Sequence, residues 1–129
     1  LKDIKNSIIT ANKREMNILI ENSNLKLSKI EDIQSFLGSN ILLSKGHIDV
    51  IISRDKIMYN KTGNPGMTVG GTGDILAGMI SGFVGQKNSL FDSACAGTFL
   101  CGKIGDQLFK KHGNGFLASD FILEISNYS

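Results

Sequence analysis

The spacing of hydrophobic residues in the first half of the chain predicts short strands alternating with helices. Asn12 stands three residues before Glu15 at the start of an amphipathic segment, which is typical of a capping box. A second such pair, Ser28 and Glu31, predicts a helix that ends at Gly38. Short apolar runs predict four strands, at residues 7–10, 41–43, 50–52 and 57–59.

The second half of the chain carries helical periodicity instead. Large and small residues recur at helical spacing over residues 75–84, which predicts a helix packed closely on both sides. We expect a longer helix from about Ser89 to Lys111, and a last one that opens at Ser119 and Asp120. There are no repeats or low-complexity tracts, so the pattern predicts one α/β domain, with strand–helix units first and helices last.

Composition and charge exclude several classes of protein. Charged residues make up 20% and the formal net charge is +2, without the basic clusters that bind nucleic acid or membrane surfaces. No apolar stretch is long enough to span a bilayer. Cys95 and Cys101 lie six positions apart on one predicted helix and would point different ways, so neither a disulfide nor a zinc site is predicted. We therefore expect a cytoplasmic protein without nucleic-acid or membrane partners.

The glycine-rich stretch from Thr62 to Asp74 is where chemistry is expected. It contains the only proline of the chain, and Gly70, Gly71 and Gly73 lead directly into a predicted helix. Glycines tolerate positive φ and let backbone amides approach a ligand closely. At the positive end of a helix such amides bind anions, and phosphate is the obvious candidate. The stretch matches neither a Walker A loop nor the Gly-x-Gly-x-x-Gly fingerprint.

Asp74 is the candidate catalytic residue because it follows these glycines directly. At the mouth of an anion site it would accept the proton of a substrate hydroxyl, while the amides stabilise the transferred phosphoryl group. The alternative is that Asp74 only caps the first helical turn and the glycines only form a tight turn. The spacing Gly-x-Gly-Asp, followed by small residues on the helix, favours the catalytic interpretation.

Two runs within this stretch resemble known enzymes. Residues 71–78, Gly-Thr-Gly-Asp-Ile-Leu-Ala-Gly, resemble the Gly-x-Gly-Asp signature of the ribokinase-like superfamily of small-molecule kinases. The longer run 62–74 resembles, more specifically, the ADP-dependent NAD(P)H-hydrate dehydratases. The segment Thr10–Glu15 falls where that family contacts its substrate, and Lys45-Gly46 falls where its nucleotide loop opens. The resemblance implies a ribokinase-like three-layer α/β/α fold.

The resemblance also implies a repair reaction on a nicotinamide cofactor whose ring has been hydrated. ADP, or ATP in some relatives, would phosphorylate the hydroxyl of NAD(P)H hydrate, and loss of phosphate would restore the ring double bond. With ADP the other product would be AMP. Phosphoryl transfer implies Mg²⁺, although no ligand set can be read from this chain. By position, Asp74 would be the catalytic base and a substrate contact, and Asn12 a second substrate contact. The nucleotide would contact Lys45, Gly46, His47, Ile48, Asp49, Gly70, Gly71, Thr72 and Gly73.

Three of these positions have plainer explanations. Residues 11–14 read Ala-Asn-Lys-Arg where Pro-His-Pro-Gly is typical of the family, so an amide replaces the histidine contact. Asn12 is equally well explained as the helix cap. His47 is better explained as a solvated loop residue, and a salt bridge at the strand end is an alternative role for Lys45.

Domains of this family are considerably longer than 129 residues, and the part without a counterpart lies before Leu1. We therefore expect residues 1–129 to be the C-terminal portion of a single ribokinase-like domain, completed by an N-terminal part or by a second polypeptide. A fused epimerase domain and a homo-oligomer are further expectations. The alternative functions are a vitamin or sugar kinase of the same superfamily and a non-catalytic nucleotide-binding fragment.

Overall fold

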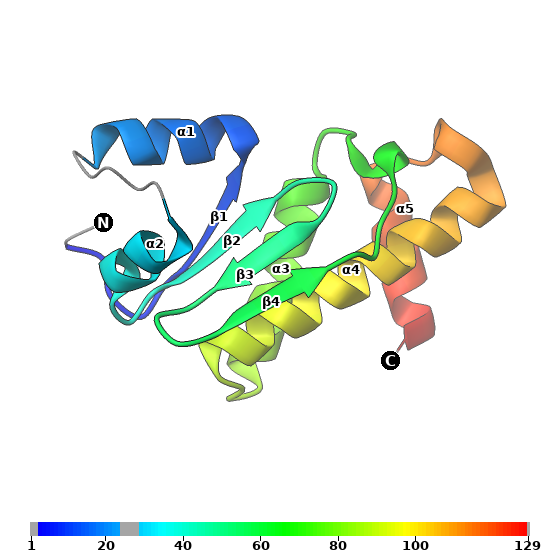
Figure 1. Cartoon of the computed structure of the whole chain (residues 1–129). Coiled ribbons are helices and arrows are strands. Elements are labelled where there is room, and N and C mark those ends of the chain that lie inside the picture. The colour runs from blue at the N-terminus through cyan, green and yellow to red at the C-terminus, as the bar shows by residue number, and fades with distance from the viewer. Residues whose placement is uncertain (1–2, 24–28, 129) are drawn as a thin grey trace.

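A four-stranded mixed sheet forms the centre of the structure, a computed structural model that describes residues 3–23 and 29–128 (Figure 1). The strands are β1 (Ile8–Asn12), β2 (Ile41–Lys45), β3 (Asp49–Ile52) and β4 (Ile57–Asn60), and they lie side by side in that order. β1 pairs with β2 in parallel, whereas β2, β3 and β4 form an antiparallel meander. All four predicted strands are therefore confirmed.

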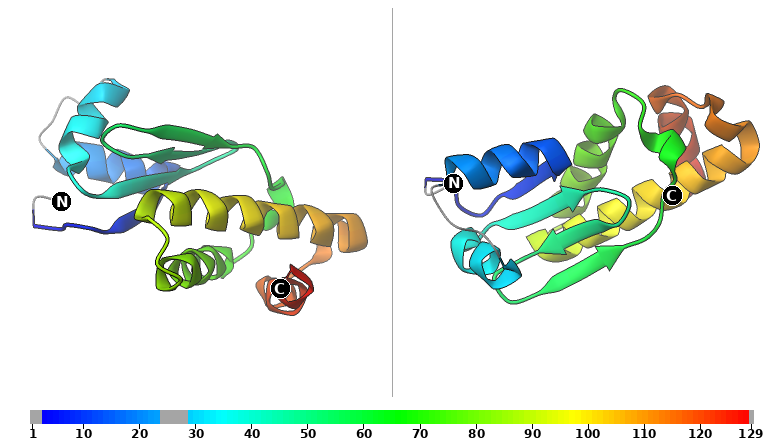
Figure 2. Two further views of the ribbon diagram at one scale, coloured as in Figure 1. Left: turned by 90° about the horizontal axis from the view of Figure 1, so that it is seen from below. Right: turned by 45° about the horizontal axis from the view of Figure 1, so that its top comes forward.

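Helices cover both faces of this sheet, which confirms the three-layer α/β/α fold (Figure 2). Helices α1 (Lys13–Asn22) and α2 (Ile30–Leu37) lie on one face, and α3 (Thr72–Gly85), α4 (Leu90–His112) and α5 (Ala118–Ile125) lie on the other. Three short 3-10 turns complete the chain: η1 (Pro65–Met67), η2 (Gly113–Gly115) and η3 (Ser126–Tyr128). None of the described helices is long and apolar enough to cross a membrane.

Alternation along the strands explains why there are two cores. Leu43 and Ile51 are fully buried against the helices α3, α4 and α5, in the larger core. Their neighbours Leu42 and Ile52 point to the opposite face and pack with residues of α1 and α2. Successive side chains of a strand face opposite sides of the sheet, so short, almost wholly apolar strands can supply both cores at once.

The first predicted helix start is confirmed in detail. Asn12 Oδ1 accepts a hydrogen bond from the backbone amide of Glu15 at 3.0 Å, and Glu15 Oε2 accepts one from the amide of Asn12 at 2.8 Å. The second predicted box involves Ser28, which lies outside the described residues. In the described part α2 begins at Ile30, where Asp32 Oδ2 accepts from the amide of Lys29 at 3.1 Å.

The last helix begins slightly earlier than predicted. Leu117 occupies the N-cap position, and Asp120 Oδ2 accepts from its backbone amide at 2.7 Å. Asp120 therefore stabilises the helix start, as expected, but from the third helical position rather than the first. Cys95 and Cys101 lie on α4, the long helix on which they were predicted, and both thiols are free.

Helix α3 packs closely on one side only, so the prediction of close packing on both sides is wrong for this structure. Leu76 and Ile80 are buried in the larger core. A Cβ added at Gly97 of α4 would lie 3.1 Å from the backbone nitrogen of Ile80, so the two helices approach almost to backbone contact. On the opposite side Gly78 and Gly82 are exposed, and an added Cβ there would meet no atom within 4 Å.

Candidate functional site

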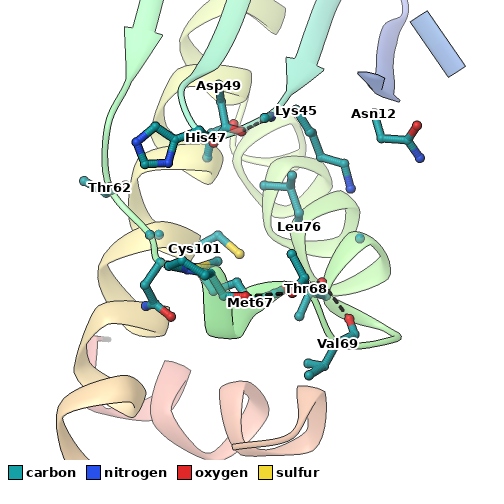
Figure 3. A pocket seen from close by; sticks show the side chains of 18 residues that line it. Asn12, Lys45, His47, Asp49, Thr62, Met67, Thr68, Val69, Leu76 and Cys101 are labelled. Atoms are coloured by element: carbon teal, nitrogen blue, oxygen red, sulfur yellow. Dashed lines mark hydrogen bonds between the residues drawn. The ribbon is translucent and has the colours of Figure 1, made fainter. Parts of the chain in front are cut away.

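A cavity of about 660 Å³ opens where the parallel strands end and α3 begins (Figure 3). Its volume is within the range of pockets that bind small molecules and cofactors. Its wall comes from the end of β1, the β2–β3 turn, the loop before α3, and one face of α4. The lining residues are Asn12, Lys45, Gly46, His47, Asp49, Thr62, Gly63, Asn64, Pro65, Met67, Thr68, Val69, Thr72, Gly73, Leu76, Thr98, Cys101 and Gly102.

The start of α3 has the features of an anion site. Gly71 takes the N-cap position with a φ of +93°, a left-handed conformation that favours glycine. The backbone amides of Gly73 and Asp74, in the first turn, donate to no acceptor in the described part of the chain. Lys45 Nζ lies 3.3 Å from the position that a Cβ on Gly73 would occupy. Unpaired amides, a positive helix end and an ammonium group therefore meet at one corner of the cavity.

Lys45 extends from the end of β2 into the cavity (Figure 3). It forms no ion pair within residues 3–23 and 29–128, so the salt-bridge alternative is wrong for the described part. Asp49 has a structural role in the adjoining turn, because its Oδ1 accepts from the amide of Gly46 and its Oδ2 from Asn60 Nδ2, both at 3.1 Å. His47 is exposed on this turn, as expected of a solvated loop residue.

Asn12 lines the cavity from the end of β1 while also capping α1. Its Oδ1 accepts from the amide of Glu15, and its Nδ2 donates to no acceptor in the described part. The two roles proposed for this side chain are therefore compatible, since the oxygen caps the helix and the nitrogen is left to face a ligand. Thr72 also lines the cavity, but its hydroxyl donates to the carbonyls of Met67 and Val69.

Asp74 lies next to Gly73 at the third position of α3, and its side chain is exposed. It is not part of the cavity wall, and neither are Ile48, Gly70 and Gly71. Of the three glycines nearest before Asp74, Gly71 takes a positive φ, whereas Gly70 and Gly73 do not. The remaining predicted residues do come together around the cavity: Asn12, Lys45, Gly46, His47, Asp49, Thr72 and Gly73.

Sequence reasoning missed the contribution of α4. Thr98, Cys101 and Gly102 line the cavity, although the long helix was expected only to pack. Burial raises the pKa of the Cys101 thiol to about 11, so it contributes a neutral side chain to the wall. The sequence did carry a signal for this contribution: Gly102 and Gly105 are three positions apart, so both lie on the same face of the helix and leave room beside it.

No metal centre is found among the described residues. Within residues 3–23 and 29–128, no three side chains of histidine, cysteine, aspartate or glutamate come close enough together to hold a metal ion. Among the described residues, the ammonium of Lys45 lines the cavity without an ion-pair partner, which suits a ligand bearing negative charge.

Comparison with known sequences gives a consistent match. The profile of one family, described as NAD(P)H-hydrate dehydratase, matches residues 2–127. The bifunctional NAD(P)H-hydrate repair enzyme of Methanothermobacter thermautotrophicus is 47% identical over 96 residues, which is 74% of this chain but 18% of that enzyme. The ADP-dependent (S)-NAD(P)H-hydrate dehydratase of Cenarchaeum symbiosum is 37% identical over 95 residues, 74% of this chain and 33% of that enzyme.

Solved structures show the same fold. A hypothetical protein from Streptococcus mutans superposes with a TM-score of 0.79 at 32% identity, covering 94% of this chain and 45% of that one. The ADP/ATP-dependent NAD(P)H-hydrate dehydratase of Bacillus subtilis, co-crystallised with ATP and Mg²⁺, superposes with a TM-score of 0.78 at 23% identity, covering 93% and 46%. This chain therefore spans less than half the length of the proteins it resembles.

Proposed function

This chain belongs to the NAD(P)H-hydrate dehydratase family, and on that premise we propose that it forms the nucleotide-binding part of an enzyme that dehydrates NAD(P)H hydrate with ADP or ATP. The observation that supports this proposal is the group of hydrogen-bond donors at the start of α3, which we call the anion corner of the cavity. There Lys45 Nζ and the unpaired amides of Gly73 and Asp74 converge at the positive end of α3. A phosphate group bound there would receive charge-assisted hydrogen bonds from all three groups.

In the proposed reaction Asp74 acts as the general base. The hydroxyl oxygen of the hydrate attacks the terminal phosphorus of the nucleotide, and the Asp74 carboxylate takes the hydroxyl proton. The bond from that phosphorus to the departing nucleotide breaks, releasing AMP when ADP is used. The amides at the start of α3 and Lys45 stabilise the negative charge on the transferred group. Elimination of phosphate, with loss of a ring proton, then restores the double bond of the reduced nicotinamide.

The exposed position of Asp74 suits this role. Because Gly73 lines the cavity and Asp74 follows it outside the wall, the nucleotide phosphate would lie on one side of this turn and the hydrate at its exposed side. Asn12, at the end of β1, would meet the hydrate with its amide nitrogen. Asn12 and Asp74 are far apart along the chain, but the C-terminal ends of the parallel strands β1 and β2 and the start of α3 lie at the same end of the sheet (Figure 3).

We propose that the rest of the enzyme packs against two surfaces that are exposed in this structure. The exposed small face of α3 and the free edge of β1 would be covered by further residues of the whole protein, since the relatives are longer than this chain. Small residues allow a second helix to approach closely, as Gly97 already does between α3 and α4. The fused epimerase domain, the homo-oligomer and the cytoplasmic location remain predictions.

Mg²⁺ is expected to accompany the nucleotide. The described side chains offer no cluster of three ligands, so most of its coordination would come from phosphate oxygens and water.

The test of this proposal separates catalysis from helix capping at Asp74. Asp92 is a matched control, because it occupies the same third position of α4 that Asp74 occupies in α3, yet the residue before it does not line the cavity, whereas Gly73 does. In the full gene product, Asp74→Asn should lower turnover at least ~100-fold, a typical contribution of general acid–base catalysis, with ADP affinity nearly unchanged. Asp92→Asn should retain turnover. Near-normal turnover in Asp74→Asn would rule out a catalytic base at this position.

A further inference from the structure

The loop that precedes α3 is fastened to α4 by one carboxylate. The backbone amide of Gly63 donates to Asp106 Oδ2 at 3.1 Å, and Asn64 Nδ2 donates to Asp106 Oδ1 at 3.0 Å. Both oxygens of Asp106 are thus used by two consecutive residues of the loop. Gly63 and Asn64 line the cavity, whereas Asp106 does not.

The orientation of the Asn64 side chain is fixed by a further bond. Asn64 Oδ1 accepts from the backbone amide of Gly66 at 3.1 Å, so its nitrogen must face Asp106. Rotating the amide by 180° would break both interactions. The three groups therefore form a chain of hydrogen bonds with a single direction, running from the Gly66 amide through Asn64 to the carboxylate on α4.

The surface of α4 is shaped to receive this loop. A Cβ on Gly102 would overlap Thr62 Oγ1 and lie 2.7 Å from the Thr62 carbonyl carbon, and a Cβ on Gly105 would lie 2.7 Å from Met67 Cγ. Thr62 Oγ1 also hydrogen-bonds the carbonyl oxygen of Phe99 at 3.1 Å. Gly102, Gly105 and Asp106 lie on one face of the helix. The carboxylate therefore lies beside the two glycines whose lack of a side chain leaves room for the loop.

We propose that Asp106 is a positioning residue of the cavity, which acts through Gly63 and Asn64 to hold the loop in the shape that the nucleotide requires. This inference rests on the proposed function for the identity of the ligand. A free loop would need to be ordered each time the nucleotide binds, and that ordering would cost affinity. The carboxylate removes this cost by fixing two adjacent residues of the wall in advance.

An exchange of the two side chains tests the proposal. In Asp106→Asn the amide nitrogen introduced at position 106 faces the donor nitrogen of either Asn64 or Gly63, so one of the two hydrogen bonds is lost, and in Asn64→Asp two carboxylates face each other. In the double variant the amide at position 106 donates to the carboxylate at position 64 and its oxygen accepts from Gly63, so the number of hydrogen bonds and the net charge are restored. We expect each single variant to bind ADP at least ~10-fold more weakly, a loss of about 1.4 kcal/mol, and the double variant within ~3-fold of the wild type.

Ile104→Val is the matched control for general loss of stability. Ile104 lies on α4, is fully buried and does not line the cavity, so this variant should lower the melting temperature without changing ADP affinity. A fall in ADP affinity in Asp106→Asn no larger than in Ile104→Val, or a double variant as weak as the singles, would overturn the proposal. If Asp106→Asn does not fold, the comparison of Asn64→Asp with the double variant decides in the same way.

Amide hydrogen exchange separates this inference from the proposed function. Measured in the ligand-free full gene product, the Gly63 amide should exchange slowly in the wild type and the double variant and faster in both singles. A wild type that does not bind ADP would refute the proposed function, and this exchange pattern would still decide whether Asp106 fastens the loop. Unchanged exchange at Gly63 in Asp106→Asn would refute the positioning role, whatever the ligand.

Discussion

Replacing Gly102 by alanine tests whether the cavity loop lies as close to α4 as the structure shows. In an open helix the exchange would stabilise the protein by about 0.8–1.0 kcal/mol, because alanine has the higher helix propensity. Here the new Cβ would overlap Thr62 Oγ1 and lie 2.7 Å from the backbone of Thr62, so the loop must move. Overpacking of this kind costs about 1–3 kcal/mol. Because the overlap involves the backbone of Thr62, we expect a cost in the upper part of this range. After the gain in helix propensity, this leaves a net destabilisation of about 1–2 kcal/mol, or roughly 3–8 °C in melting temperature for a domain of this size.

The control is Gly78→Ala on α3. An alanine Cβ at Gly78 meets no atom within 4 Å, so the same exchange should stabilise the 129-residue chain by about 0.8 kcal/mol. Urea or thermal denaturation of both variants gives the comparison, and titration with ADP shows whether displacement of the loop also weakens binding. A Gly102→Ala variant as stable as the wild type, or more stable, would contradict the close approach of Thr62 to α4.

Three further predictions concern the anion corner, the C-terminal ion pair and the buried thiol. Gly73→Val should weaken ADP binding at least ~10-fold by calorimetry, because its side chain fills the space beside Lys45 Nζ, and unchanged affinity would remove the anion-site assignment. Hydrogen bonds from Lys111 Nζ lower the pKa of Glu124, so this interaction stabilises the fold above the ordinary carboxyl pKa and is lost as pH falls. Glu124→Gln should therefore be less stable than the wild type at pH 7, with the difference closing below about pH 4, and a gap independent of pH would contradict this. Because burial raises the pKa of Cys101 to about 11, iodoacetamide should label it very slowly at pH 8, and fast labelling there would show that the cavity wall opens.

The fold was largely predictable because local signals agree with tertiary packing. The apolar runs of the four strands and the Asn12–Glu15 capping box each depend on neighbours in sequence, and each is found in the structure. The small face of α3 was misjudged because sequence spacing shows that a helix can be approached closely, and does not show whether anything approaches it. That face is exposed at Gly78 and Gly82.

The candidate site was predictable where it is continuous along the chain. The glycines before α3 and the Lys45–Asp49 turn carry their own signals in turn chemistry and charge, and the cavity brings most of them together. Asp106 and the α4 wall were missed because their role depends on contacts across about forty residues, such as Asp106 with Gly63. A lone aspartate on a long helix looks like a solvated residue until the loop that it binds is placed beside it.

The most direct test of the proposed activity supplies hydrated NADH and Mg²⁺ to the full gene product and follows recovery of the dihydronicotinamide absorbance with ADP, with ATP and without nucleotide. We predict recovery that requires a nucleotide and is matched by release of free phosphate. A stable phosphorylated product, without recovered absorbance, would indicate a small-molecule kinase. Bound ADP with neither product would contradict the proposed dehydration and favour a non-catalytic nucleotide-binding protein.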